Sequence, residues 1–157
     1  RIIGMINGPE KLPATKERLD GYIQAMTKSR LKYDPALVLN CDLTTESVCA
    51  ATEKLLTGKR RPTAIVTFND YVALDATKYT RSQGLKVNKD ISFVSYANLP
   101  ITSYMDDPPL ASVEQFPYQQ AEKATGILLQ LIQSKGGDES IPHKVVLESK
   151  VMVNKGD

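Results

Sequence analysis

Short apolar runs alternate with longer segments whose apolar residues recur every three or four positions, from the start of the chain to about residue 96. The runs at residues 2–6, 36–40, 64–68 and 91–96 are short, and the run at 64–68 is β-branched and aromatic, which is typical of buried strands. Helical patterns follow the first three runs, beginning near residue 14, between residues 48 and 56, and over residues 71–83. The order predicts an α/β fold with a parallel, right-handed, doubly wound sheet.

The pattern changes after about residue 98. Residues 99–110 contain three prolines and two acidic residues, which predicts a long irregular loop. A brief extended piece over 111–115 precedes Pro117, which is well placed to begin a helix. This helix is expected to end at Gly136–Gly137, and two further strands are expected at 144–147 and 150–153. Its apolar face comprises Ala121, Ala124, Leu128, Leu131 and Ile132.

Composition narrows the functional classes. A length of 157 residues suits one domain, and a net charge of +2 is too small to predict nucleic acid binding by this segment. No apolar run is long enough to span a membrane, so no membrane partner is expected. The chain opens at Arg1 directly into a strand, so we expect residues to precede it. The two cysteines, Cys41 and Cys49, form no CxxC pair, which favours packed thiols in a reducing cytosol.

Signals for enzymatic activity are weak. The GxGxxG dinucleotide fingerprint, the P-loop and the G-x-S-x-G elbow are all absent from the sequence. The lone His143 has no evident nucleophile near it, and a metal site built from His143, Cys41 and Cys49 is less favoured than two packed thiols and a surface imidazole. We therefore predict no enzyme, no metal site and no cofactor.

Polar residues lie at or near the ends of the predicted strands. Carboxyl ends of parallel strands meet at one edge of a sheet, where α/β proteins bind their ligands. An arginine fork and several carboxamides suit a polyhydroxyl ligand, since its hydroxyls both donate and accept. Each residue also has a structural alternative, because Asn69 and Asp70 could cap the next helix and Arg18 could be a solvated charge. The set comprises Arg18, Asp42, Asn69, Asp70, Asn98 and Gln115.

Several motifs in this order and spacing resemble one known family. They are RIIGMINGP at 1–9 with ERLDGY at 17–22, RPTAIVTFNDYVAL at 61–74, GLKVNKDISFVSY at 84–96, PPLASVEQ at 108–115 and VVLESKVMV at 145–153. The whole chain resembles the C-terminal part of the effector-binding core of LacI/GalR-type transcription regulators. This resemblance implies the type I fold of periplasmic-binding-protein-like cores, with two subdomains that enclose a small effector.

The resemblance also implies a division of the chain. Residues 1–111 would form the C-terminal subdomain, and 112–147 would form a crossover with a helix and strand of an otherwise missing N-terminal subdomain. Residues 148–157 would be a return strand and tail. An uncovered apolar helix face of this kind tends to associate. The fragment is therefore expected to associate rather than stay a uniform monomer.

Effector positions carry over by resemblance alone. Arg18 matches an arginine that grips sugar hydroxyls, Leu12 and Ala14 match wall positions, and Asn69 and Gln115 match residues near the cleft. Leu43 stands where some members place a stacking aromatic ring. Ala97 stands where many members have a hydroxyl-binding aspartate, and Asn98 is a candidate substitute. The predicted ligand-binding set is Leu12, Ala14, Arg18, Leu43, Asn69, Ala97, Asn98 and Gln115.

The resemblance implies further partners. They are a small carbohydrate-like effector, operator DNA bound through a missing N-terminal helix-turn-helix, and a second copy, because Leu74 and its neighbours on helix 71–83 match a dimer surface. Such a regulator would be cytoplasmic. A periplasmic sugar-binding component of a transporter has the same fold and remains the alternative.

Overall fold

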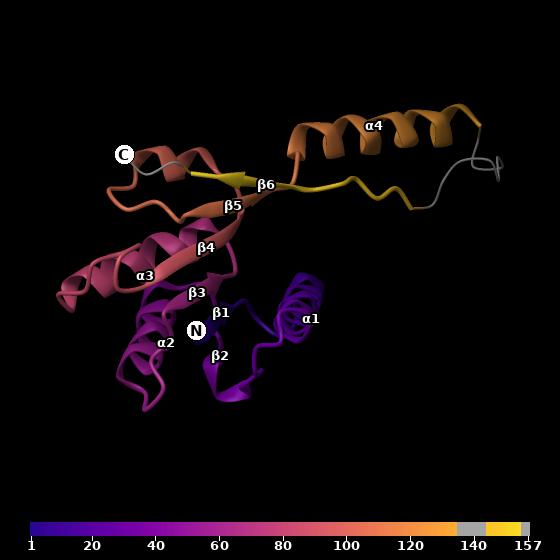
Figure 1. Cartoon of the computed structure of the whole chain (residues 1–157). Coiled ribbons are helices and arrows are strands. Elements are labelled where there is room, and N and C mark those ends of the chain that lie inside the picture. The colour runs from indigo at the N-terminus through magenta and orange to yellow at the C-terminus, as the bar shows by residue number, and fades with distance from the viewer. Residues whose placement is uncertain (135–143, 155–157) are drawn as a thin grey trace.

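Six strands form one sheet in the order β2-β1-β3-β4-β5-β6 (Figure 1). The computed structural model describes residues 1–134 and 144–154. The first five strands are parallel, and β6 is antiparallel to β5. The strands are β1 (Ile3–Asn7), β2 (Val38–Asn40), β3 (Ala64–Thr67), β4 (Ser92–Ala97), β5 (Ala111–Glu114) and β6 (Lys150–Val153). The predicted mainly parallel, doubly wound α/β sheet is confirmed.

Helices cover both faces of the sheet (Figure 1). One face carries α2 (Thr45–Thr57) and α3 (Asp70–Ser82), and the other carries α1 (Pro13–Lys28). On the α2–α3 face, Ile6, Ile65 and Phe93 from three adjacent strands are fully buried against the helices. Burying each such side chain contributes about 1.5–3 kcal/mol, so this face holds most of the hydrophobic stabilisation.

The α1 face has a smaller core. Met5, Tyr22 and Met26 are buried there, and the predicted apolar positions Leu19 and Ile23 pack against them. The hydroxyl of Tyr22 donates to the Ile3 carbonyl at 2.8 Å, which fixes α1 to β1. The helical spacing of these residues therefore predicted the correct buried face.

Two strands differ from expectation. The segment 36–40 was predicted as a strand, but Pro35–Leu37 forms a 3-10 turn whose first N–H groups are capped by Asp34, and β2 spans only three residues. Residues 144–147 were predicted as a strand but are not one. A β-rich sequence forms a strand only when another strand pairs with it, and this segment instead lies beside a helix.

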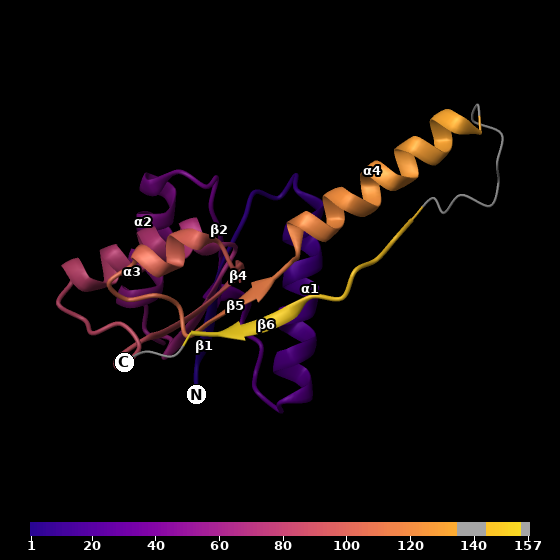
Figure 2. The ribbon, with the colours of Figure 1, turned by 90° about the horizontal axis from the view of Figure 1, so that it is seen from above.

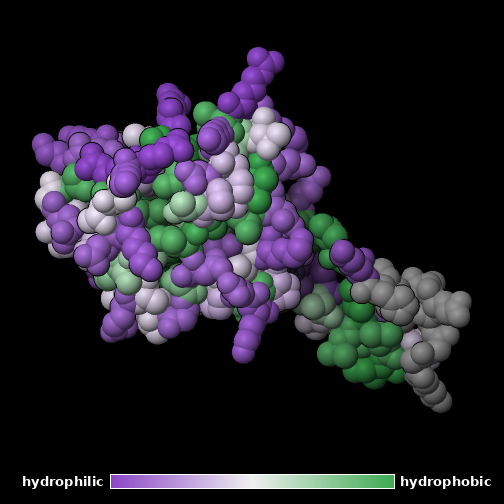
Figure 3. Space-filling view, turned by 90° about the horizontal axis from the view of Figure 1, so that it is seen from below, coloured by the Kyte–Doolittle hydropathy of each residue, from purple (hydrophilic) through white to green (hydrophobic). Residues whose placement is uncertain are grey.

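That helix, α4 (Pro117–Gln133), projects away from the sheet together with residues 144–149 (Figure 2). We call these two segments the arm. None of the α4 residues is buried. Leu128 and Ile132 are 56% and 64% exposed, and hydrophobic side chains gather on the arm in the space-filling view (Figure 3). The expected helix end at Gly136–Gly137 and the predicted surface imidazole of His143 lie outside the described residues.

Candidate functional site at the carboxyl edge of the sheet

The carboxyl ends of β1, β3, β4 and β5 lie at one edge of the sheet, because these strands are parallel and in adjacent register. Ala97 at the end of β4 pairs with Glu114 at the end of β5. The chain leaves this edge through Gln115 and Phe116 to enter α4. The edge therefore carries both the predicted polar side chains and the connection to the arm.

Arg18 reaches this edge from α1. Its Nη1 donates to the Phe68 carbonyl at the end of β3 at 2.7 Å. Its guanidinium carbon lies 4.1 Å from the ring centre of Phe68 and 4.6 Å from that of Tyr96. Stacking on two rings is favourable for a cation, while burial lowers the pKa of Arg18 from its usual value. The arginine is therefore held in place and half-buried.

Gly8 makes room for this arrangement. A Cβ at Gly8 would lie 2.7–2.8 Å from three atoms of the Phe68 ring, which is closer than real Cβ atoms approach. The break after β1 thus lets the ring lie where it can stack on Arg18. The resemblance pointed to Arg18, but the roles of Phe68 and Gly8 depend on contacts between distant residues.

Asn69 and Asp70 have structural partners. The side chain of Asn69 accepts the Val72 N–H at 3.0 Å and caps α3, so the capping alternative is correct for this oxygen. Asp70 is fully buried and accepts the hydroxyls of Ser95 and Ser112 and the N–H of Leu99. Asp70 therefore ties α3 to β4, β5 and the following loop, instead of facing a ligand.

Asn98 joins β4 to the crossover. Its Nδ2 donates to Glu114 Oε2 at 2.8 Å, and Glu114 Oε1 accepts the Phe116 N–H at 2.6 Å. These bonds lower the pKa of Glu114, with the Asn98 bond as the largest cause. Sequence reasoning missed Glu114. Its place near the end of the predicted extended piece 111–115, one position before Gln115, was the available signal.

Four non-glycine residues at or near the strand ends have positive φ: Leu43 (71°), Ala97 (94°), Asn98 (48°) and Phe116 (52°). Such conformations cost of order 1–3 kcal/mol each and cluster at ligand sites and switch regions. Asn98 and Phe116 belong to the Asn98–Glu114–Phe116 network, and Ala97 pairs with Glu114 in the sheet. The network therefore holds a strained backbone where the sheet passes into the arm.

The remaining predicted residues lie less closely together. Leu12 and Leu43 are each 40% exposed, and Ala14 packs partly against the main core. Gln115 is half-buried, and its carbonyl accepts from the Gln120 side chain at 2.6 Å. Asp42 is exposed and accepts hydrogen bonds from the hydroxyls of Ser47 and Thr44 and from the Thr44 N–H, which together lower its pKa to about 2. Direct contacts thus connect Arg18 with the ends of β3 and β4, and Asn98 with the end of β5.

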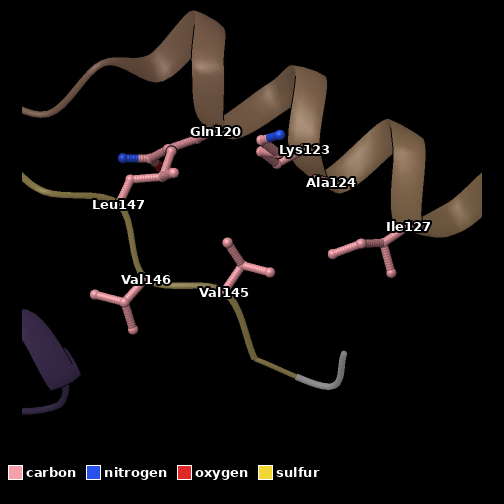
Figure 4. Close-up of a pocket in the computed structure, with 7 residues that line it drawn as sticks. All are labelled: Gln120, Lys123, Ala124, Ile127, Val145, Val146 and Leu147. Carbon is pink, nitrogen blue, oxygen red and sulfur yellow. The ribbon is translucent and has the colours of Figure 1, made fainter. Parts of the chain in front are cut away.

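Two hollows are present among the described residues, one beside this cluster and one away from it. One of about 280 Å³ separates α1 from the β4–β5 part of the sheet and includes Tyr96. The other, of about 480 Å³, lies within the arm between α4 and residues 145–147 (Figure 4). Its lining residues Val145 and Ile127 face each other across the opening, while Val146 points away.

The described residues place further limits on the chemistry. Across 1–134 and 144–154, no group of three or more His, Cys, Asp or Glu side chains is arranged to hold a metal ion. In the same residues, no helix combines the length and apolar character that a membrane span requires. Both cysteines are free thiols, with Cys41 buried and Cys49 half-buried.

A family model described as the periplasmic binding protein-like domain matches residues 1–155. The chain belongs to this family. Its curated relatives include the HTH-type transcriptional repressor CytR of Escherichia coli K12, to which the chain is 35% identical over 133 residues. The repressor PurR of Aliivibrio salmonicida is 32% identical over 139 residues. These matches cover 85% and 88% of the chain but 39% and 41% of the relatives, so the chain spans less than half their length.

Solved structures confirm the fold of this periplasmic binding protein-like chain. A regulatory protein of the LacI family from Chloroflexus aggregans superposes with a TM-score of 0.86 at 28% identity, covering 98% of the chain and 54% of that protein. The transcriptional regulator CelR, solved with cellobiose, superposes with a TM-score of 0.88 at 29% identity, covering 98% and 46%. The resemblance to LacI-type regulators is thereby confirmed.

Proposed function

We propose that this chain is the ligand-sensing part of a bacterial transcription regulator of LacI type. One observation carries the proposal: a half-buried arginine and a strained amide–carboxylate network share the sheet edge from which the chain crosses into the arm. The relatives CytR and PurR, which are repressors, support it. Their nature also favours a cytoplasmic regulator over the periplasmic component of a transporter and over an enzyme.

The effector, a sugar or sugar derivative, is proposed to bind at the carboxyl edge. Arg18 supplies N–H donors, and the amides of Asn69, Asn98 and Gln115 supply donors and acceptors that capping leaves over. Leu12, Ala14, Leu43 and Ala97 form apolar parts of the wall. CelR, solved with cellobiose, supports a carbohydrate-like ligand for this fold.

Residues 1–111 are proposed to form one subdomain, with 112–147 as the crossover and part of a second subdomain and 148–157 as the returning strand and tail. The first three residues of that crossover segment belong to β5, and β6 lies in the same sheet as β1, which supports a return. The described part of the arm would pack in the second lobe. A ligand held between the lobes would shift the population towards one angle between them.

In the full-length protein, this change of angle is proposed to alter operator binding by a helix-turn-helix that precedes the chain. A homodimer formed through α3 around Leu74 would transmit the change to two DNA-binding heads. Leu74 is half-buried on α3, whose neighbouring Ala73 and Ala76 are fully buried in the core. The two faces of one helix could thus serve packing and association separately.

The test uses full-length protein and genomic DNA fragments that it selects. Thermal shift with mono- and disaccharides, sugar acids and sugar phosphates should identify a stabilising ligand, and fluorescence anisotropy should show that this ligand changes DNA affinity. Arg18→Ala should weaken ligand binding at least tenfold, as expected on loss of charge-assisted hydrogen bonds, while circular dichroism stays unchanged. Failure of the full-length protein to bind any DNA fragment would refute the proposal.

A further inference from the structure

The charge balance at the carboxyl edge indicates which class of ligand fits there. Arg18 carries a full positive charge at neutral pH, and its guanidinium has five N–H donors, one of which is bonded to the Phe68 carbonyl. Among the described residues, no carboxylate lies within salt-bridge distance of Arg18. This half-buried cation has lost part of its hydration, and the nearby Glu17 offsets that loss only partly, without forming a salt bridge with it.

Three carboxylates near the strand ends already accept hydrogen bonds within the protein. Both oxygens of Asp70 accept hydrogen bonds in the buried core, from two serine hydroxyls and a backbone N–H. Both oxygens of Glu114 are bonded, one to Asn98 and the other to the Phe116 N–H. Asp42 accepts from Thr44 and Ser47 in the cap of α2. Asp70 is closed to a ligand by its burial, and Glu114 and Asp42 already accept hydrogen bonds from the protein at this edge.

Stacking surfaces at this edge are also restricted. The rings of Phe68 and Tyr96 each have the Arg18 guanidinium against one face. The side chains of Leu43 and Ala97 have neither a ring nor a hydrogen-bonding group. A neutral sugar would meet one fixed cation here whose charge it cannot neutralise, and two rings that already stack on that cation. An oxyanion, in contrast, would accept the remaining N–H groups of Arg18 and neutralise its charge.

We infer that the ligand of this edge is anionic, a small polyol that bears a carboxylate or a phosphate, with its oxyanion on the free edge of the Arg18 guanidinium. This inference rests on the proposed ligand-sensing function and specifies the ligand class of that same site. Asn98 Oδ1 and the Gln115 amide lie on the adjoining strand end and crossover and suit the hydroxyls of such a molecule.

The experiment compares full-length wild type with Arg18→Gln, which keeps a polar side chain but removes the charge. Lys16→Gln is the matched control, because Lys16 is exposed on the same helix and pairs with Asp20. Melting temperature is followed in titrations with inorganic phosphate, acetate, glucose, glucuronate and glucose 6-phosphate at constant ionic strength. Calorimetry then gives the affinity of any probe that stabilises the wild type.

The expected result is a saturable rise in melting temperature with at least one anionic probe, which Lys16→Gln retains. Arg18→Gln should lower the binding affinity for that probe by about tenfold to a hundredfold, the usual loss when charge-assisted hydrogen bonds are removed. A response to phosphate and glucose 6-phosphate identifies a phosphate ligand, and one to acetate and glucuronate identifies a carboxylate.

Three outcomes overturn the inference: no saturable response to any anion, equal responses in wild type and Arg18→Gln, or tighter binding of neutral glucose than of its charged counterparts. The last outcome leaves the proposed sensing function intact, because it still shows a sugar site. Absence of DNA binding in the anisotropy assay would refute the regulator while leaving an anion site standing, so the two failures are distinguishable.

Discussion

Asp70 provides a sharp test of how the sheet edge is held together. Its carboxylate is fully buried and accepts three hydrogen bonds: from the hydroxyl of Ser95, from that of Ser112 at 2.9 Å, and from the Leu99 N–H at 2.7 Å. These donors come from β4, β5 and the loop after β4. Replacement of Asp70 by Ala therefore removes the acceptor that connects three segments to the start of α3.

The expected loss in free energy of unfolding depends on whether each of the three donors finds another acceptor. Hydrogen bonds to charged groups contribute about 1.5–3 kcal/mol each, so three at the lower end amount to about 4–5 kcal/mol. The Ser95 hydroxyl also lies 3.3 Å from the Tyr96 carbonyl and can turn towards it, but the Leu99 N–H cannot rotate. We expect Asp70→Ala to lower the free energy of unfolding by about 3–4 kcal/mol, a large share of the 5–15 kcal/mol typical of a domain.

Urea unfolding followed by circular dichroism measures this loss. Asp70→Asn keeps the side-chain volume and one acceptor oxygen but turns an amide N–H towards the Leu99 N–H, so a loss of about 1–2 kcal/mol is expected. Asp75→Ala is the matched control on the same helix, since Asp75 accepts one bond, from the exposed Thr45 hydroxyl, and should cost under about 1 kcal/mol. An Asp70→Ala protein as stable as the Asp75→Ala protein would refute the reasoning.

Three further predictions concern local features. Asn69→Ala removes the cap on the Val72 N–H and should lower the free energy of unfolding in urea by about 1 kcal/mol. Asn69→Ser should lower it by much less, because a serine side chain can also cap the helix. Equal stability of the two variants would contradict the capping role. The folded pKa of Asp42 lies below its ordinary 3.8, so the stability that Asp42 contributes is complete above about pH 4 and is lost as the pH falls towards 2. Asp42→Asn should therefore make the free energy of unfolding less dependent on pH between about pH 4 and pH 2. An unchanged pH dependence would contradict this role of Asp42. The isolated 157-residue chain should associate through the exposed apolar face of its arm, so light scattering should give a mass above that of a monomer, and Leu128→Glu with Ile132→Glu should reduce it; a monomer mass for the unmutated chain would exclude this association.

The element order was predictable because it depends on local periodicity. Apolar runs at 2–6, 64–68 and 91–96 correspond to β1, β3 and β4 within a residue at each end, and the spacing of Leu19, Tyr22 and Met26 identified the buried face of α1. The local pattern of apolar residues failed to predict strands whose formation depends on pairing with another strand. Residues 144–147 have the composition of a strand but no strand beside them, and β2 is cut short by the turn at Pro35–Leu37.

The site was predictable only as a set of candidates. The resemblance singled out Arg18, and its position on the edge is supported by the bond to the Phe68 carbonyl. The pattern could not distinguish Asp70, which is buried among internal donors, from Asn69, whose side chain caps α3 and keeps a free amide group. It also missed Glu114, whose role appears only when Asn98 and Phe116 lie beside it.

The sequence alone determined the alternating order of strands and helices, because the helix and strand periods depend on residues close together in the chain. It also determined that the polar residues after the strands gather at one edge, because strands joined through helices run in the same direction. Tertiary structure decided which of those groups remain free to meet a ligand. The partners that occupy them are far apart in sequence, 50 residues for Arg18 and Phe68 and 42 for Asp70 and Ser112. A hydrogen bond requires its two atoms to lie within about 3 Å, and only the packing of strands and helices brings such distant residues that close.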